Sequence, residues 1–425
     1  MSVTNSTEIT SLTTAEVAAI TTAEISALTL GKIGDFTTAQ ISYLTTAAIA
    51  ALTTDNIRGL GSTNSNQIAA LTTAQVLAIE TQDFATLYNT QLKAFTTAGV
   101  AALSTDQIRV LDSLNIGGLT TSQIAVLNTA QTQAIETVDI SDYGLSSLQL
   151  GGLSTASAAV LTTAQVAALG SNLVGLTTAA VASLSTAQIE ALTTLNISYF
   201  TTGQVAALST AQVQAIQTED FFRLRAAQLG GLTAAITTAG PVAFTTAQIQ
   251  ALDIGNISGI TSKAIVALNT AQVSVIEPYD LGALTTAQVA AIESGDIAIL
   301  TSQQLAGLTA LQTPAFATDQ VNAINSAAIG GLIDAAFGAF STAQIEALSV
   351  SNARGITASQ LGRLNTAQAT AIQSEDIRAI TSTAFDGLTT QQAANLTTAQ
   401  VAAIVSGSIE GIRTGSIRAL SLIHI

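Results

Sequence analysis

The sequence predicts an all-α solenoid of very short helices, in which three eight-residue units form one 24-residue coil. Three observations predict it: an eight-residue repeat along nearly the whole chain, a helix-capping pattern at the start of each unit, and a second period that spans three units. Because helices of this length are unstable alone, only stacking on neighbouring coils would hold them in place.

The repeat is an octad of the form (Thr/Ser/Asn/Asp)-Thr-Ala-Gln-Φ-x-Ala-Φ, where Φ is Val, Ile, Leu or Phe. From Thr245 to Leu420 the octads run without an insertion or deletion. TTAQ, STAQ and NTAQ mark the clearest copies, which begin at Thr37, Thr72, Thr162, Thr245, Thr285, Thr397, Ser185, Ser209, Ser341, Asn128, Asn269 and Asn365.

The repeat register also predicts the organisation of the chain. We expect an N-terminal lead-in (1–12), one continuous solenoid (13–420) and an apolar tail (421–425). The repeat register slips in four places, and we expect loops or kinks there: near 61–71, 136–153, 170–176 and 233–244. Pro241 lies in the last of these segments.

The composition of each octad favours a helix. Position one is mostly a good N-cap residue, and Gln, Asp or Glu follows three residues later, which is the capping-box pattern. A continuous helix is excluded, because its apolar face would rotate by about 80° per octad. We therefore expect a helix of about one and a half turns and then a corner. The alternative is a three-sided parallel β-solenoid, which Thr, Val and Ile favour, whereas abundant Ala and the capping pattern favour helices.

Octad position four carries the second period. It is usually Gln, but at intervals it becomes Asn and then, three octads later, Asp. Residues that are three octads apart would then stack on successive coils. The predicted structural ladder consists of four pairs: Asn115 and Asp139, Asn196 and Asp220, Asn256 and Asp280, and Asn352 and Asp376.

The same aspartates are candidate ligands for Ca²⁺, which prefers several oxygen ligands: Asp139, Asp220, Asp280 and Asp376. The simpler interpretation is that acidic residues in a first turn cap the helix and complement its dipole. Rows of Thr are also a feature of ice-binding solenoids, although capping explains them more simply. We expect no catalytic residue and no cofactor.

Composition argues against several functions. The formal net charge is −15 with only 12 Lys plus Arg, which disfavours nucleic acids and anionic membrane surfaces. There is no Cys, and the single His, His424, lies in the SLIHI tail, so nucleophilic catalysis is not expected. No apolar stretch reaches the roughly 18 residues of a membrane-spanning helix, and the N-terminus lacks the pattern of a cleavable signal peptide.

The TTAQ-type octads resemble the Thr/Ala-rich repeat regions of large secreted or surface proteins of Gram-negative bacteria. The resemblance covers nearly the whole chain and implies adhesion, surface-layer or filament-forming roles, with an extracellular or cell-surface location and no cleaved signal; the cytoplasm is the alternative. We expect a non-enzymatic, elongated acidic scaffold that self-associates end to end. The alternatives are a module that binds protein, glycan, Ca²⁺ or ice, and a length-setting ruler.

Overall fold

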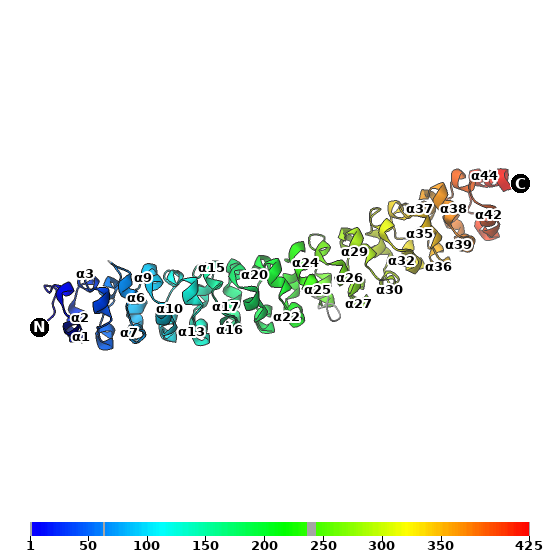
Figure 1. Cartoon of the computed structure of the whole chain (residues 1–425). Coiled ribbons are helices and arrows are strands. Elements are labelled where there is room, and N and C mark those ends of the chain that lie inside the picture. Colours follow the sequence, from blue (N-terminus) through cyan, green and yellow to red (C-terminus); the bar gives the residue numbers. More distant parts are fainter. Residues whose placement is uncertain (1, 63, 236–243, 425) are drawn as a thin grey trace. The chain divides into compact units, whose positions relative to one another are not determined.

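The computed structural model describes residues 2–62, 64–235 and 244–424, and the chain divides into two compact units, Met1–Ile216 and Gln217–Ile425. In both units the regular elements are short helices wound coil upon coil (Figure 1). The described residues contain no strand. The all-α solenoid is therefore confirmed, and the β-solenoid is not supported.

In the first unit the α-helices are α1 (Thr14–Ala18), α2 (Thr22–Ala27), α3 (Leu30–Gly34), α4 (Thr38–Ile41), α5 (Thr46–Ala50), α6 (Asn66–Ala69), α7 (Thr73–Ala78), α8 (Thr81–Phe84), α9 (Asn89–Ala94), α10 (Thr97–Ala101), α11 (Thr105–Arg109), α12 (Thr121–Ile124), α13 (Thr129–Ala134), α14 (Thr137–Ile140), α15 (Ser147–Leu150), α16 (Thr155–Ala159), α17 (Thr163–Ala168), α18 (Thr178–Ala182), α19 (Thr186–Glu190), α20 (Thr194–Tyr199), α21 (Thr202–Ala206) and α22 (Thr210–Ala215). Its 3-10 helices are η1 (Ile9–Ser11), η2 (Ile57–Gly59), η3 (Ile116–Gly118) and η4 (Gly170–Gly175).

In the second unit the α-helices are α23 (Thr218–Phe221), α24 (Ala226–Ala235), α25 (Thr246–Gln250), α26 (Ser262–Val266), α27 (Thr270–Ser274), α28 (Pro278–Ala283), α29 (Thr286–Ala290), α30 (Ser294–Ile297), α31 (Ser302–Ala306), α32 (Thr318–Ala323), α33 (Ser326–Ile329), α34 (Asp334–Gly338), α35 (Thr342–Glu346), α36 (Val350–Ala353), α37 (Ala358–Arg363), α38 (Thr366–Ala371), α39 (Ser374–Ala379), α40 (Ser382–Phe385), α41 (Thr390–Ala393), α42 (Thr398–Ala403), α43 (Ser406–Ile409) and α44 (Thr414–His424). Its 3-10 helices are η5 (Ile257–Gly259) and η6 (Thr313–Ala315).

The octad 285–292 shows how one unit forms. Thr285 is the N-cap residue, with extended backbone (φ −69°, ψ 159°), and its hydroxyl accepts a hydrogen bond from the Gln288 backbone N–H at 3.3 Å. The Gln288 side-chain oxygen accepts in return from the Thr285 backbone N–H at 2.6 Å. This reciprocal capping box begins the helix, and the extended N-cap of the next octad ends it. The predicted alternation of short helix and corner is confirmed.

Replacing Thr285 with alanine is expected to lower the free energy of unfolding by about 1 kcal/mol, because the Gln288 N–H loses its side-chain acceptor and keeps only the Thr285 backbone oxygen. Thr286 is the matched control, since it lies on the exposed side of the same turn. Urea unfolding followed by circular dichroism measures both variants. Equal effects at the two positions would contradict the capping role of Thr285.

The apolar core runs along the inside of the coils. It consists mainly of the residues at octad positions five and eight, such as Val289, which is fully buried, and Ile292, which is 4% exposed. Position four is also buried although it is polar, with Gln288 at 3% exposed. Positions one to three mostly face solvent. A row of buried side-chain amides at position four therefore runs beside the thin apolar core.

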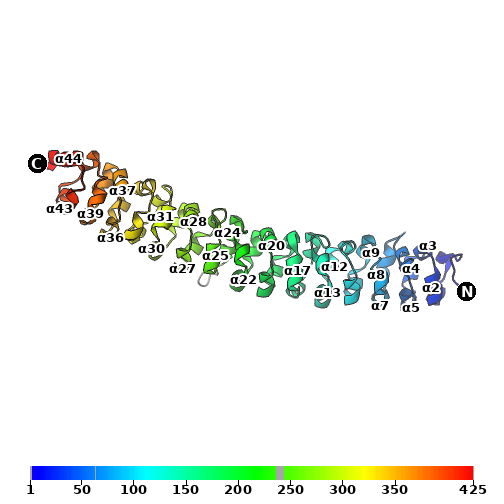
Figure 2. The same cartoon turned by 180° about the vertical axis from the view of Figure 1, so that it is seen from behind.

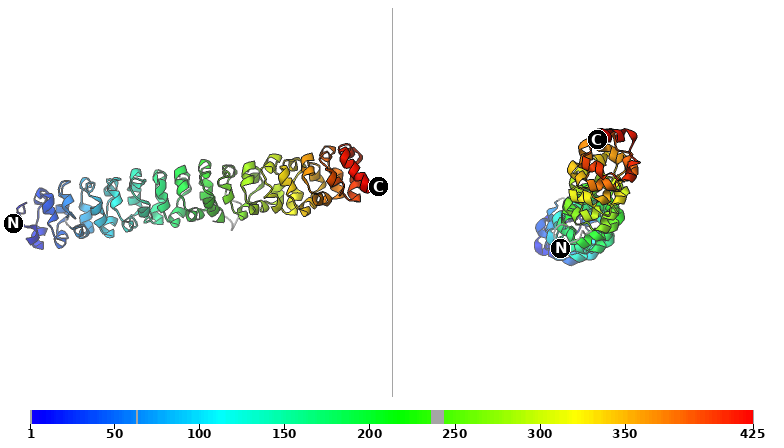
Figure 3. Two further views of the ribbon diagram at one scale, coloured as in Figure 1. Left: turned by 90° about the horizontal axis from the view of Figure 1, so that it is seen from above. Right: turned by 90° about the vertical axis from the view of Figure 1, so that its right-hand side faces the viewer.

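Helices that are three octads apart in the sequence lie against one another. In the second unit α35 contacts α38 and α36 contacts α39; in the first unit α11 contacts α13. Figures 1 and 2 show α7 and α13 along one edge of the first unit and α9 along the opposite edge, and Figure 3 shows the coils from above. The predicted stacking of every third octad is confirmed.

Two of the predicted register slips contain glycines with positive φ: Gly61 (φ 79°) and Gly170 (φ 53°). Both conformations favour glycine because a side chain would strain the backbone there. Near Gly170, the Asp142 carboxylate accepts a hydrogen bond from the Ser171 hydroxyl at 2.8 Å. The slip at 233–244, with Pro241, lies mostly outside the described residues.

Candidate functional site

The glutamine at octad position four links each octad to an earlier coil. In the octad 389–396, the Gln392 side-chain nitrogen donates to the backbone oxygens of Leu361 at 2.8 Å and Leu364 at 2.6 Å. Its side-chain oxygen accepts from the Thr389 N–H at 2.8 Å. Because a helix leaves its first N–H groups and last carbonyls unpaired, one amide here satisfies three backbone groups.

The same arrangement recurs along both units. The bonded carbonyls lie 31 and 28 residues before the glutamine, so they belong to the octad four positions earlier, whereas helix-to-helix contacts join octads three positions apart. Each octad therefore rests on two earlier ones. Glutamines that form both bonds are Gln40, Gln107, Gln123, Gln131, Gln204, Gln212, Gln304, Gln312, Gln320, Gln344, Gln360, Gln392 and Gln400.

Asparagine performs the same task with a shorter side chain. The Asn352 side-chain nitrogen donates to the Val321 oxygen at 3.0 Å and to the Asn322 oxygen at 3.3 Å. The Asn352 side-chain oxygen accepts from the Ser349 N–H at 2.6 Å. The four asparagines of the predicted ladder are all buried: Asn115, Asn196, Asn256 and Asn352.

The aspartates at position four are buried as well, but they form no capping box. Asp376 is 1% exposed, and neither of its carboxyl oxygens has a hydrogen-bond partner; the same holds for Asp83 and Asp139. The expectation that these acids cap their helices is therefore wrong for Asp139 and Asp376, and Asp83 likewise caps no helix. A carboxylate brings only acceptors, whereas the position facing an earlier coil requires a donor.

Burial is the first cause of a raised pKa in these aspartates, and neighbouring carboxylates are the second. The pKa of Asp376 rises from the ordinary value of 3.8 to about 6, through burial and the nearby Glu375. The pKa is likewise raised to about 6 at Asp83, Asp139, Asp220 and Asp280.

The structure brings most of the predicted ladder pairs onto neighbouring coils. Asn352 and Asp376 lie on α36 and α39, which are in contact, and Asn256 and Asp280 lie in octads whose helices η5 and α28 touch. The charge of Asp112, at the start of the Asn115 octad, contributes to the raised pKa of Asp139. Asn196 and Asp220 belong to different units.

The calcium assignment of Asp139, Asp220, Asp280 and Asp376 stays a prediction. Among the described residues, no three His, Cys, Asp or Glu side chains gather in a way that would hold a metal ion. Two of these aspartates, Asp139 and Asp280, follow the N-cap residues Glu136 and Glu277, which are exposed and form no side-chain capping bond. The N-cap residues Glu80 and Glu293 are of the same kind.

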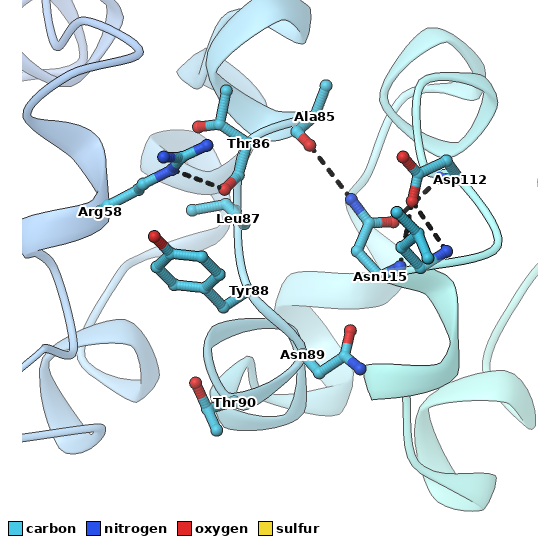
Figure 4. A pocket seen from close by; sticks show the side chains of 10 residues that line it. Arg58, Ala85, Thr86, Leu87, Tyr88, Asn89, Thr90, Asp112 and Asn115 are labelled. Atoms are coloured by element: carbon cyan, nitrogen blue, oxygen red, sulfur yellow. Dashed lines mark hydrogen bonds between the residues drawn. The ribbon is translucent and has the colours of Figure 1, made fainter.

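A pocket of about 410 Å³ lies on the first unit, where the sequence predicted no site. Figure 4 shows its lining, with Arg58 beside Tyr88 and Asn115 facing Ala85. The Arg58 guanidinium lies 5.1 Å from the centre of the Tyr88 ring, and its Nε donates to the Thr86 oxygen at 3.0 Å. The sequence signal that could have located this pocket is a departure from the repeat. Tyr88 occupies octad position one, where Thr is usual.

The Arg58 pocket has a half-exposed aromatic ring and an exposed apolar residue at its rim. Tyr88 is 54% exposed and Leu114 is 82% exposed. Asp112 is engaged locally, because its carboxylate accepts from the backbone N–H groups of Leu114 and Asn115 at 2.9 and 3.1 Å. The pocket thus offers a cation stacked on an aromatic ring, which is a surface suited to binding.

Two remaining sequence expectations concern the tail and the membrane. α44 runs through Thr414–His424, and the side chain of His424 lies outside the part of the chain whose side chains are described. No helix among the described residues is both long enough and apolar enough to cross a bilayer.

A model of the ALTTAQ repeat matches the chain at residues 76–113, 273–310, 289–326 and 369–406. The predicted TTAQ-type repeat region is thereby confirmed. A comparison with curated proteins gave no match. Together with the helical solenoid, the repeat match fits a structural repeat protein.

Proposed function

We propose that this chain is a non-enzymatic scaffold whose role is to present a regular surface along a stack of coils. The observation that supports this most directly is the use of the position-four amides. These buried polar side chains, such as Gln360 and Gln392, hydrogen-bond to backbone groups of their own octad and of the octad four positions earlier. The hydrogen-bonding groups of these amides therefore serve to join the coils.

The finer role that we propose is that of an acidic surface protein, with adhesin-like or filament-forming activity and an extracellular or cell-surface location. The net charge of −15 and the small, polar residues at the exposed octad positions support it. Self-association of coils belongs to this proposal, because stacked repeats add neighbours through the same contacts that join them internally.

The scaffold hypothesis predicts that whole octads are removable. Deleting 285–332, which is six octads, should leave the circular dichroism per residue unchanged and shorten the particle in proportion, because each octad touches only octads close to it in the stack. Small-angle scattering and electron microscopy measure the dimension. Deleting 285–328 is the matched control, since it shifts the register by half an octad and should disrupt the coils that follow. Equal tolerance of both deletions would refute the stacked scaffold.

A binding module is the second candidate, and the Arg58 pocket favours it. Glycan arrays and peptide arrays are suitable screens, followed by calorimetry on any ligand found. The Arg58→Ala variant should lose ligand binding. The Tyr88→Phe variant should retain part of it, because the aromatic ring remains. Arg109→Ala is the control, since Arg109 is exposed and pairs with Asp106 at 2.6 Å away from the pocket lining.

A further inference from the structure

The position-four aspartates occupy the place where the repeat otherwise puts a hydrogen-bond donor. Aspartate and asparagine have the same shape, and the Asn352 amide nitrogen donates to carbonyls of an earlier coil at 3.0 and 3.3 Å. Asp376 lies one coil further on, at the same octad position, in a helix that contacts the Asn352 helix. A carboxyl oxygen therefore stands where an amide N–H₂ would point at backbone oxygens.

The register identifies the groups that face Asp376. Octads run without interruption here, and position-four amides reach carbonyls 31 and 28 residues earlier, which are those of Ile345 and Leu348 for Asp376. Within the described structure the Leu348 carbonyl oxygen accepts no hydrogen bond, and neither carboxyl oxygen of Asp376 has a partner. Two sets of lone pairs thus meet in a buried position, which is costly unless a proton or a cation lies between them.

A proton suits this position better than a metal ion. Asp376 is 1% exposed, and the register brings to it the carbonyl oxygens of Ile345 and Leu348 beside its own carboxyl oxygens. Ca²⁺ requires six to eight oxygens, whereas one proton converts the carboxyl into the donor that the repeat uses at this position.

We propose that in mildly acidic solution Asp376 and its position-four counterparts Asp83 and Asp139 are neutral carboxylic acids in the folded protein, each donating a hydrogen bond to a backbone carbonyl of an earlier coil. Loss of that proton places a charge against the carbonyl and loosens the coil. These octads are thus pH-sensitive joints, whereas the joints made by glutamine and asparagine do not titrate.

The charges around Asp376 agree with this assignment. Its own helix α39 carries Glu375 and Arg378, Arg354 follows α36, and Glu346 ends α35; α42 has no charged residue. Of these, Glu375 affects Asp376, and it disfavours the charged form in the same direction as burial. The pKa of the folded state, about 6, lies above the ordinary value of 3.8. The stabilisation is therefore complete below about pH 4 and is lost as the pH rises through 6.

The test is Asp376→Asn in the full chain, which supplies the donor permanently. Hydrogen exchange of the amides in 373–380, corrected for intrinsic rates, and chemical unfolding are measured from pH 4.5 to 8. Above pH 7 the variant should open up to about 100-fold less often than the wild type, and at pH 4.5 the two should be alike. The reciprocal variant Asn352→Asp should lose protection only above pH 6.

Asp319→Asn is the matched control, because Asp319 is exposed on α32, and it should change protection at no pH. Infrared spectra at pH 5 should show a protonated-carboxyl band that weakens in Asp376→Asn. A difference between Asp376→Asn and wild type that is independent of pH would overturn the proposal. The proposal would also be overturned if added Ca²⁺ slowed hydrogen exchange in the wild type at pH 7.5 but not in Asp376→Asn. That result would assign the position to a cation.

Discussion

Replacing Gln392 with alanine is expected to lower the free energy of unfolding by more than about 3 kcal/mol, whereas the same change at the adjacent Gln391 leaves stability unaltered. Gln392 is 2% exposed, and its removal leaves the Thr389 N–H and the Leu364 carbonyl without partners, while the Leu361 carbonyl keeps only the Leu364 N–H at 3.3 Å. Gln391 is exposed in the same helix. The effect is large because one side chain is the only partner of two backbone groups and one of two partners of a third.

Chemical unfolding measures both glutamine variants, and hydrogen exchange locates the loss. Gln392→Ala should increase exchange in the octad 357–364 as well as in its own, because the lost bonds join the two. Gln392→Asn should recover part of the stability, since asparagine already serves at position four elsewhere. If Gln391→Ala and Gln392→Ala have similar effects, the position-four amide is not the link between coils.

Replacing Gly331 with alanine is expected to force two coils apart and to destabilise the chain by about 2–4 kcal/mol. A Cβ atom at Gly331 would lie 2.1 Å from the Ser302 backbone oxygen, and backbone atoms have no rotamer with which to move away. Ser302 belongs to the octad three positions earlier, so the strain falls on the contact that stacks coils. The close approach is thus the physical reason for glycine at octad position seven.

Gly295→Ala is the matched control, because Gly295 lies in α30 with no neighbouring atom within 4 Å of the added Cβ. Alanine there should be neutral or should stabilise the helix by up to about 1 kcal/mol, because glycine is the poorer helix former. Thermal unfolding of the two variants against wild type is the measurement. A harmless Gly331→Ala would show that the coils are not held at this separation.

The fold class was predictable because its signals are local. The capping box spans one turn, and the octad period excludes a continuous helix by simple geometry. The stacking of every third octad was predictable from the Asn-to-Asp spacing at position four, which gave Asn352 and Asp376 as neighbours on successive coils. Each of these inferences concerns residues whose relation is fixed by a period in the chain.

The fate of the position-four side chains was not predictable from the same pattern. Gln392 fits a capping box by its sequence alone, but its second role depends on the carbonyls of Leu361 and Leu364, four octads earlier. No property of those two leucine side chains marks them as partners. The pattern also suggested that Asp376 caps a helix, and its burial against an earlier coil shows otherwise.

The sequence by itself therefore determined the helices and their caps, because hydrogen bonds within one octad set them. It also determined which octads stack, because position four repeats with a period of three octads. Only the tertiary structure decided which backbone oxygens each amide meets, which aspartates lose contact with water, and that Arg58 stacks on Tyr88. Those outcomes depend on the offset between coils, which arises from side-chain packing and close backbone contact summed over many octads and is not encoded in any single one.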